Sequence, residues 1–296
     1  MTQQQELKRK LDAAGLKLKY HLGQNFLADR ELTRSLASYA GITPGDAVLE
    51  IGPGAGALSE ALLDAAAPGG LVVAYEIDQD LKKLLQEVAA RYPAFQFELQ
   101  DAVTVNFRQD FLPRIEQRPY RVAANLPYYL TSKLMEKCLC ELPQAESMAF
   151  MIQEDVLERL VDRGAKRQSG PLTALIKSYG TLYIAKHLPA AAFFPPPRVN
   201  SVFIVLRPYD QANNPQPLAT ALLRQAPADW QKFLHSCYRQ RRKTLVNNLK
   251  NAETEENFRM DPARVKTALQ NLHRSESSRA ENLDLAELAQ IYLDLK

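Results

Sequence analysis

The residues best suited to chemistry are Asn125-Leu-Pro-Tyr128, which directly follow a predicted strand at 120–124. The exocyclic amine of adenine is a poor nucleophile, because its lone pair is delocalised into the ring. The side-chain oxygen of Asn125 and the backbone carbonyl of Leu126 can accept its two N–H groups and turn the lone pair toward a methyl donor. Pro127 fixes the backbone, and Tyr128 offers a ring on which a base can stack. Taken alone, the tetrapeptide is equally consistent with a turn that buries a tyrosine.

A glycine-rich turn, Gly52-x-Gly54-x-Gly56, lies between a predicted strand and a predicted helix. Without side chains at these positions, a ligand can approach the backbone and the helix N-terminus. The spacing is not the G-x-G-x-x-G of dinucleotide sites, and no phosphate-loop Lys-Ser/Thr follows. The turn is a weak signal by itself, and a tight turn without a ligand is the alternative.

Acidic residues occupy the ends of neighbouring strands. Glu76 follows Gly56 by 20 residues, where a carboxylate can accept hydrogen bonds from ribose hydroxyls, and Asp101 could accept a proton from an adenine amine. Glu50 is expected to add negative charge beside the glycines. These acids would repel a pyrophosphate, so they favour an adenosine that carries a cationic group, such as S-adenosylmethionine. Solvated acids at strand ends are the alternative.

Strands and helices alternate along the first two thirds of the chain. This alternation predicts parallel βαβ units and an α/β doubly wound, mostly parallel sheet. The predicted strands are 47–51, 71–75, 95–99, 120–124, 148–152 and 201–206, and the predicted helices between them are 29–40, 57–67, 79–91, 131–139, 154–162 and 172–179. Beyond residue 207 the pattern predicts helices only, at 218–225, 228–250, 262–272 and 284–294. We therefore expect a domain at 1–207, with a basic N-terminal arm at 1–27, and a small all-helical C-terminal domain at 208–296.

The composition is that of a globular protein of about two domains, with 296 residues of which 46% are hydrophobic and 24% charged. Three cysteines (Cys138, Cys140 and Cys237) have neither a disulfide pattern nor metal-ligand spacing, so we expect a reducing compartment and no metal. No run is long and apolar enough to cross a membrane, and the N-terminus lacks the apolar core of a signal peptide. The expected location is cytoplasmic.

Basic residues cluster in one place, although the net charge is only +3. Residues 232–250 contain six Lys or Arg and no acid, and Arg239, Arg241, Arg242 and Lys243 lie within the predicted helix 228–250. Most charge runs are solvated helix faces. Beside a site that modifies a base, contact with RNA phosphates is the better expectation.

Together these phrases resemble the bacterial small-subunit (16S) ribosomal RNA adenine dimethyltransferases, the KsgA/RsmA family. The resemblance extends from about residue 17 to the end of the chain. The phrases that carry it are Gly23-Gln-Asn-Phe-Leu27, Glu50-Ile-Gly-Pro-Gly-Ala-Gly56, Glu76-Ile-Asp78, Asp101-Ala102, Asn125-Leu-Pro-Tyr-Tyr129, Phe193-Phe-Pro-Pro-Pro-Arg-Val199 and Gln240-Arg-Arg-Lys-Thr-Leu245.

The resemblance implies a Rossmann-like class I methyltransferase fold and a role for each matching residue. Asn25 and Leu27 would line the S-adenosylmethionine pocket with Gly52 and Gly54, Glu76 would hold the ribose and Asp101 the adenine. Asn125 would serve both cofactor and target, and Phe194 would cover the target base opposite Tyr128. The family dimethylates two adjacent adenosines in the 3′-terminal hairpin of the RNA, so the expected partner is 16S ribosomal RNA in an immature small subunit, bound by a monomer.

Two other functions fit parts of this pattern. A large-subunit ribosomal RNA methyltransferase of the macrolide-resistance type would use the same cofactor and chemistry. The helical C-terminal part and the Gln240-Arg-Arg-Lys-Thr phrase favour the small-subunit enzyme. A nucleic-acid-binding factor that has lost catalysis is the third possibility. The intact Asn125-Leu-Pro-Tyr128 and glycine turn argue against it, because binding alone requires neither.

Overall fold

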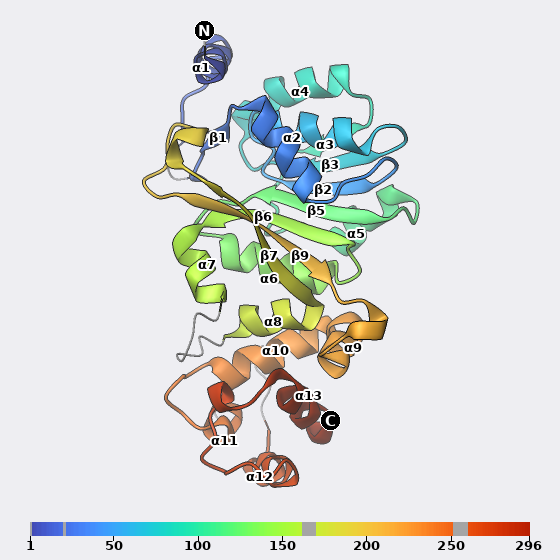
Figure 1. Ribbon diagram of the computed structural model, residues 1–296, viewed down its shortest axis with the longest axis vertical. Coiled ribbons are helices and arrows are strands. Elements are labelled where there is room, and N and C mark those ends of the chain that lie inside the picture. Colours follow the sequence, from blue (N-terminus) through green and yellow to red (C-terminus); the bar gives the residue numbers. More distant parts are fainter. Residues whose placement is uncertain (1, 20–21, 162–169, 251–259) are drawn as a thin grey trace. The chain divides into compact units, whose positions relative to one another are not determined.

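The computed structural model describes residues 2–19, 22–161, 170–250 and 260–296, and within them it contains a seven-stranded sheet (Figure 1). The strand order is β4-β3-β2-β5-β6-β9-β7. Strands β4, β3, β2, β5 and β6 pair in parallel, and β9 runs antiparallel to β6. The bounds are β2 Ala47–Ile51, β3 Leu71–Tyr75, β4 Phe95–Glu98, β5 Tyr120–Asn125, β6 Ser147–Gln153, β7 Gly180–Leu188 and β9 Ser201–Pro208.

The predicted fold class is confirmed. The central strands β2 and β3 are buried along their whole length, as expected for parallel strands covered on both faces. One face carries α2 (Arg30–Tyr39), α3 (Ala57–Ala66) and α4 (Lys82–Arg91), whose apolar side chains share one core with the strands. The other face carries α5 (Phe107–Asp110) and α6 (Thr131–Glu141) (Figure 1). The ring of Phe107 on α5 lies 5.7 Å from that of Tyr75 on β3.

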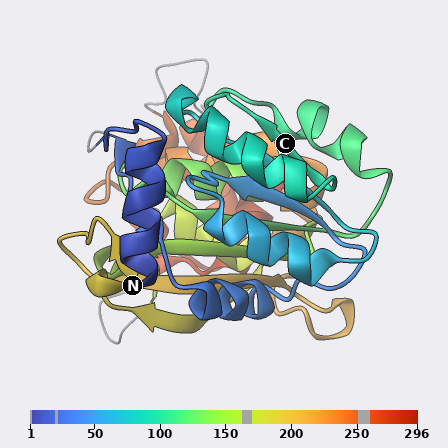
Figure 2. The same ribbon diagram turned by 90° about the horizontal axis from the view of Figure 1, so that it is seen from above.

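The N-terminal arm contains a helix that the sequence pattern did not reveal, α1 (Gln3–Ala13). Thr2 and Gln5 form a capping box at its start, and its buried Leu11 packs in a small apolar cluster with Phe26 and Leu81. Strand β1 (Phe26–Leu27) pairs antiparallel with β8 (Phe193–Phe194). Viewed from above, α1 lies alongside the segment that precedes β8 (Figure 2), and Gln4 Nε2 donates to the Ala191 carbonyl.

The edge strand β7 is also absent from the predictions. Strand β7 is the last strand in the sheet order and pairs only with β9 among the described residues. Its buried and exposed residues therefore do not alternate regularly, and the neighbouring Tyr183 and Ile184 are both exposed. Short 3₁₀ helices complete this part at η2 Gln79–Leu81, η3 Leu112–Ile115 and η4 Ala190–Ala192, and α7 spans Glu154–Leu160.

The chain divides into two compact units, and the division differs from the predicted boundary. Unit 1 comprises residues 1–138, 145–157 and 182–207, and unit 2 comprises 139–144, 158–181 and 208–296. Helix α8 (Pro171–Tyr179) belongs to the helical unit, because Trp230 Nε1 donates to Ser178 Oγ (3.0 Å) inside its apolar core. The other helices of unit 2 are η5 Gln211–Asn213, α9 Pro217–Gln225, α10 Pro227–Tyr238, α11 Leu245–Lys250, α12 Pro262–Asn271, η6 Ala280–Asn282 and α13 Leu285–Leu295.

The prediction of a single helix at 228–250 is wrong, because residues 239–244 are not helical. Buried Asn248 on α11 donates through Nδ2 to the carbonyl of Cys237 (2.7 Å) and to that of Gln240 (3.2 Å). These bonds satisfy carbonyls at the end of α10 that a continued helix would have used itself. Arg239, Arg241, Arg242 and Lys243 therefore lie in an exposed connection between two helices rather than on a helix face.

No helix in the described part of the chain is long and apolar enough to cross a membrane.

Candidate functional site

A cavity of about 700 Å³ opens at the carboxyl ends of strands β2, β3, β4 and β5 in unit 1. Six of the predicted site residues line it, and four of these come one from each strand end: Gly52, Glu76, Asp101 and Asn125. Parallel strands present their carboxyl ends at one edge of a sheet, which is why residues so far apart in sequence meet there.

The glycine turn closes one side of the cavity. Gly52 and Gly54 have φ values of +71° and +59°, which residues with side chains rarely adopt. A Cβ on Gly54 would lie 3.0 Å from the ring of Phe26, so a side chain here would require that ring to shift by a few tenths of an ångström. The backbone N–H of Gly54 donates to Glu76 Oε2 (3.0 Å). Gly54 therefore shapes the site through Glu76, although it does not line the cavity.

Glu76 is held in one orientation by backbone donors. Its Oε1 accepts from the N–H of Asp78 (2.9 Å), and its Oε2 accepts from Gly54. The residue is only 6% exposed, and burial raises the pKa of its carboxyl above the ordinary value. A carboxylate with both oxygens anchored can accept further hydrogen bonds along defined directions, as binding of a ribose diol requires.

Asp101 follows β4 at the next position along the edge. It is half-buried, and its Oδ1 accepts from the N–H of Val103 (2.8 Å). This bond orients the carboxylate toward the cavity that Asp101 and Ala102 line.

Glu50 behaves differently from the prediction. It is fully buried in β2, and neither carboxyl oxygen has a hydrogen-bond partner among the described residues. Burial raises its pKa to about 8, and the nearby charge of Glu76 acts in the same direction. Glu50 is thus mostly protonated at neutral pH and does not add the negative charge that the sequence suggested.

The Asn125 side chain is held by one hydrogen bond. Its Nδ2 donates to the backbone carbonyl of Asn25 (3.0 Å), and no described residue donates to its Oδ1. Leu126 is buried, and its N–H donates to the Met151 carbonyl (3.3 Å). Pro127 lines the cavity, and its carbonyl accepts from the N–H of Leu130 (3.0 Å). The turn thus brings Asn125 and Pro127 to the cavity wall.

The two tyrosines of this turn take different places. Tyr128 is half-buried and does not line the cavity; its hydroxyl lies 3.5 Å from Ser201 Oγ, and burial raises its pKa. Tyr129, which the sequence analysis did not single out, lines the cavity and is 60% exposed. Phe194 is half-buried and pairs with Phe26 across β8 and β1.

Residues before β1 form a further wall that strand-end reasoning could not supply. Asn25 lines the cavity as predicted, together with Leu22, Gly23, Gln24 and Phe26. Leu27 does not line the large cavity but a smaller adjoining one of about 280 Å³, which Gly52 and Asn125 also line. The only sequence signal for this wall is the Gly23-Gln-Asn-Phe-Leu27 phrase itself, since no pattern links it to strand ends about 50–100 residues away.

The predicted RNA-binding residues belong to unit 2. Arg239, Arg241, Arg242 and Lys243 are exposed, and Arg241 forms an ion pair with Glu281 (2.5 Å). Among the described residues no group of three or more His, Cys, Asp or Glu has the arrangement of a metal site, and the three cysteines are buried and form no disulfide.

Comparison with known proteins identifies relatives over nearly the whole chain. A family model described as "Ribosomal RNA adenine dimethylase" matches residues 15–287. A "Ribosomal RNA small subunit methyltransferase A" from Lactobacillus delbrueckii subsp. bulgaricus is 34% identical over 249 residues, which is 78% of this chain and 77% of the relative.

Two solved structures share the fold. One is a dimethyladenosine transferase from Plasmodium falciparum (TM-score 0.68, 21% identity, covering 90% of this chain and 96% of the other). The second is the 23S rRNA methyltransferase ErmE (TM-score 0.59, 22% identity, covering 92% of this chain and 99% of the other).

Proposed function

Because the chain belongs to the ribosomal RNA adenine dimethylase family, we propose that it dimethylates adenosines of small-subunit ribosomal RNA with S-adenosylmethionine. The target is the N6 amine of two adjacent adenosines in the 3′-terminal hairpin. The observation that carries this function is that Asn125 lines the cavity with its Nδ2 donating to the Asn25 carbonyl, while no described residue donates to its Oδ1.

The residues at the strand ends fit the cofactor. Glu76 would accept hydrogen bonds from the ribose, Asp101 from the adenine amine, and Gly52 gives a wall without a side chain. When bound, S-adenosylmethionine supplies an electrophilic methyl group. With Glu50 protonated, Glu76 and Asp101 are left as the acids facing the ligand.

Residues Asn125–Tyr128, called the catalytic turn below, would act on the target amine. The Asn125 Oδ1 and the Leu126 carbonyl would each accept one N–H of that amine, which directs its lone pair toward the methyl donor. Pro127 keeps the backbone of the turn fixed. No strong general base is needed, because the methylated ammonium is acidic enough to lose its proton to water.

Aromatic rings would hold the target base. We propose that Tyr128 and Phe194 stack on its two faces, with Tyr129 at the cavity wall contributing to the same contact. Stacking of a base on an aromatic side chain is worth about 1–3 kcal/mol.

The exposed residues Arg239, Arg241, Arg242 and Lys243 would contact phosphates of the RNA. We further propose that the substrate is an immature small subunit, that the protein acts as a monomer, and that it works in the cytoplasm, where such subunits are assembled.

The test is incubation with labelled S-adenosylmethionine and separated small- and large-subunit ribosomal RNAs, the small-subunit RNA also as unmethylated particles. We expect label in small-subunit material alone, recovered by mass spectrometry as N6,N6-dimethyladenosine at two adjacent positions. Label in the large-subunit RNA would establish the macrolide-resistance type of activity instead. Cofactor and RNA binding without any transfer would establish a binding factor.

A further inference from the structure

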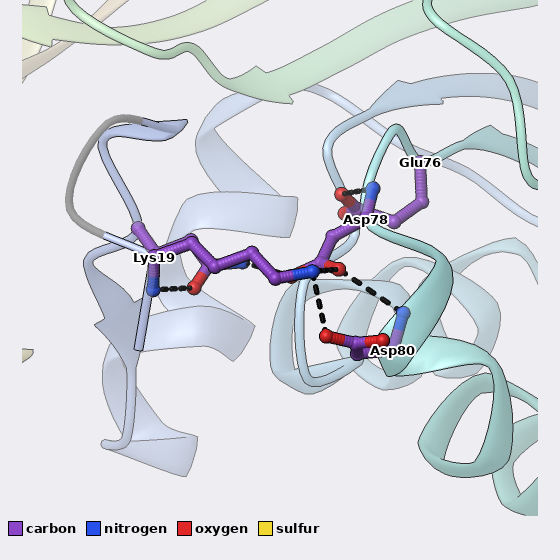
Figure 3. Close-up of polar contacts among 5 residues, drawn as sticks. Lys19, Glu76, Asp78 and Asp80 are labelled. Carbon is purple, nitrogen blue, oxygen red and sulfur yellow. Dashed lines mark hydrogen bonds and ion pairs between the residues drawn. The ribbon is translucent and has the colours of Figure 1, made fainter. Parts of the chain in front are cut away.

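Residues 22–26 form one wall of the cavity, and charged side chains that do not line the cavity hold this wall in place. Lys19 Nζ forms ion pairs with Asp78 (2.5 Å) and Asp80 (2.6 Å), as Figure 3 shows. From the wall itself, Gln24 Nε2 donates to the second oxygen of Asp78 (2.5 Å), and Gln24 Oε1 accepts from the N–H of Lys19 (2.9 Å). Lys19, Gln24, Asp78 and Asp80 are called the arm clasp below.

Asp78 is the centre of the arm clasp. Its side chain is 2% exposed, so its charge is removed from water and depends on its partners. Burial alone would raise the pKa of Asp78, but the bonds from Lys19, the Asp80 N–H and Gln24 together lower it. A buried carboxylate that loses its cation becomes strongly unfavourable.

The arm clasp acts on the loop that orients Glu76. The N–H of Asp78 donates to Glu76 Oε1 (2.9 Å) (Figure 3). Asp78, which holds the arm, therefore also holds Glu76, the residue proposed to bind the ribose. At the other end of the wall, the carbonyl of Asn25 accepts from Asn125 Nδ2, and Phe26 pairs with Phe194. One short segment thus contacts both the cofactor side and the target side of the site.

We infer that Lys19 is a positioning residue for the cofactor: by joining Asp78 and Asp80 it holds residues 22–26 against the cavity without touching the ligand. This inference rests on the cofactor assigned above. The direct effect of Lys19, the ordering of residues 22–26, can be measured on the protein without any ligand. Failure of this inference can therefore be distinguished from failure of the cofactor assignment.

The test compares Lys19→Met with Lys19→Arg and with Lys17→Met, which removes an exposed lysine of the same arm. Hydrogen exchange on the free protein should show faster exchange of the amides at 22–26 in Lys19→Met only. The dissociation constant for S-adenosylhomocysteine should rise about ten- to a hundredfold in Lys19→Met, as expected when bonds to a charged group are removed. Lys19→Arg should retain most of the affinity, and Lys17→Met all of it.

A second ligand distinguishes positioning from simple charge. S-adenosylmethionine carries a sulfonium charge that S-adenosylhomocysteine lacks, so removing a nearby cation by itself would favour S-adenosylmethionine. We expect both affinities to fall together, and any fall in kcat at saturating cofactor to be smaller than the fall in affinity, because Asn25 of the same segment also holds Asn125. Unchanged exchange at 22–26, a rise in affinity for S-adenosylmethionine alone, or a fall in kcat with unchanged affinities would each overturn the inference. Unchanged cofactor affinity despite faster exchange would also overturn it. Binding of neither ligand by the unaltered protein would instead contradict the cofactor assignment.

Discussion

At the scale of single residues, Glu76 is the clearest test of the cofactor site. Glu76→Ala removes a carboxylate whose two backbone donors, Gly54 and Asp78, lie in separate loops, without opening a cavity in the apolar core. Loss of hydrogen bonds to a charged group should weaken S-adenosylmethionine binding by about 1.5–3 kcal/mol. Calorimetry measures this, with Glu98→Ala as the control, because Glu98 ends β4 but does not line the cavity. Parental affinity in folded Glu76→Ala protein would remove Glu76 from the site.

Glu50 predicts a dependence of stability on pH. The folded chain keeps the Glu50 proton up to about pH 8, whereas an unfolded glutamate releases it near pH 4.5. Between these values the unfolded chain binds fewer protons at this position, so the free energy of unfolding falls as pH rises. For one group the slope is about 1.4 kcal/mol per pH unit.

Glu50→Gln should remove this contribution. Denaturant unfolding at pH 5, 6, 7 and 8 should show the variant gaining stability relative to the parent as pH rises, with the difference levelling off above pH 8. Parallel curves for Glu50→Gln and the parent would mean that Glu50 is already ionised in the folded chain.

At the scale of elements, Asn248 determines the shape of the basic connection between α10 and α11. Asn248→Ala leaves the carbonyl of Cys237 without its donor and leaves that of Gln240 with the Lys243 N–H alone, which should cost about 1–3 kcal/mol of stability. RNA affinity should fall as well, because residues 239–243 lose a fixed arrangement. Thermal unfolding and RNA titration measure both effects.

Its matched control is Asn247→Ala, since the neighbouring Asn247 is exposed. If the two variants were equally stable and bound RNA alike, Asn248 would not shape the connection.

The same elements show what sequence could predict. Strands β2, β3 and β5 are buried runs that end in a turn or an acid, so both the strands and the edge where Gly52, Glu76 and Asn125 meet were predictable. Parallel pairing then brings these ends together without further information.

Other elements depend on interactions between distant parts of the chain. Helix α1 is mostly polar and packs through Leu11 on a cluster that includes Phe26 and Leu81. The break after α10 depends on a side chain eleven residues after Cys237. The wall at 22–26 depends on Asp78 and Asn125. Local periodicity contains none of these interactions, which explains the missed helix α1, the helix predicted too long at 228–250, and why only the family resemblance pointed to the wall.

At the scale of the whole molecule, chemistry and RNA affinity are expected to separate between the two units. The catalytic turn lies in unit 1 and the basic connection in unit 2. Replacing Arg241, Arg242 and Lys243 by Ala should weaken RNA binding and reduce the slope of log affinity against log salt. The expected reduction is roughly 0.7–0.9 for each RNA phosphate that the variant no longer neutralises.

Cofactor affinity and the transfer rate at saturating RNA should hardly change. Lys82→Ala/Lys83→Ala, which removes exposed charge from α4, is the control. If the triple variant kept the parental salt slope, these residues would be solvated surface charges that do not contact the RNA.

The most direct measurement is single-turnover methyl transfer by folded Asn125→Ala protein saturated with RNA and cofactor. Removing one of two acceptors for the target amine should lower the rate about a hundred- to a thousandfold, while RNA affinity stays near that of the parent. Thermal unfolding establishes that the variant is folded. A transfer rate near the parental value in such protein would contradict the mechanism, because Asn125 would then only stabilise a turn.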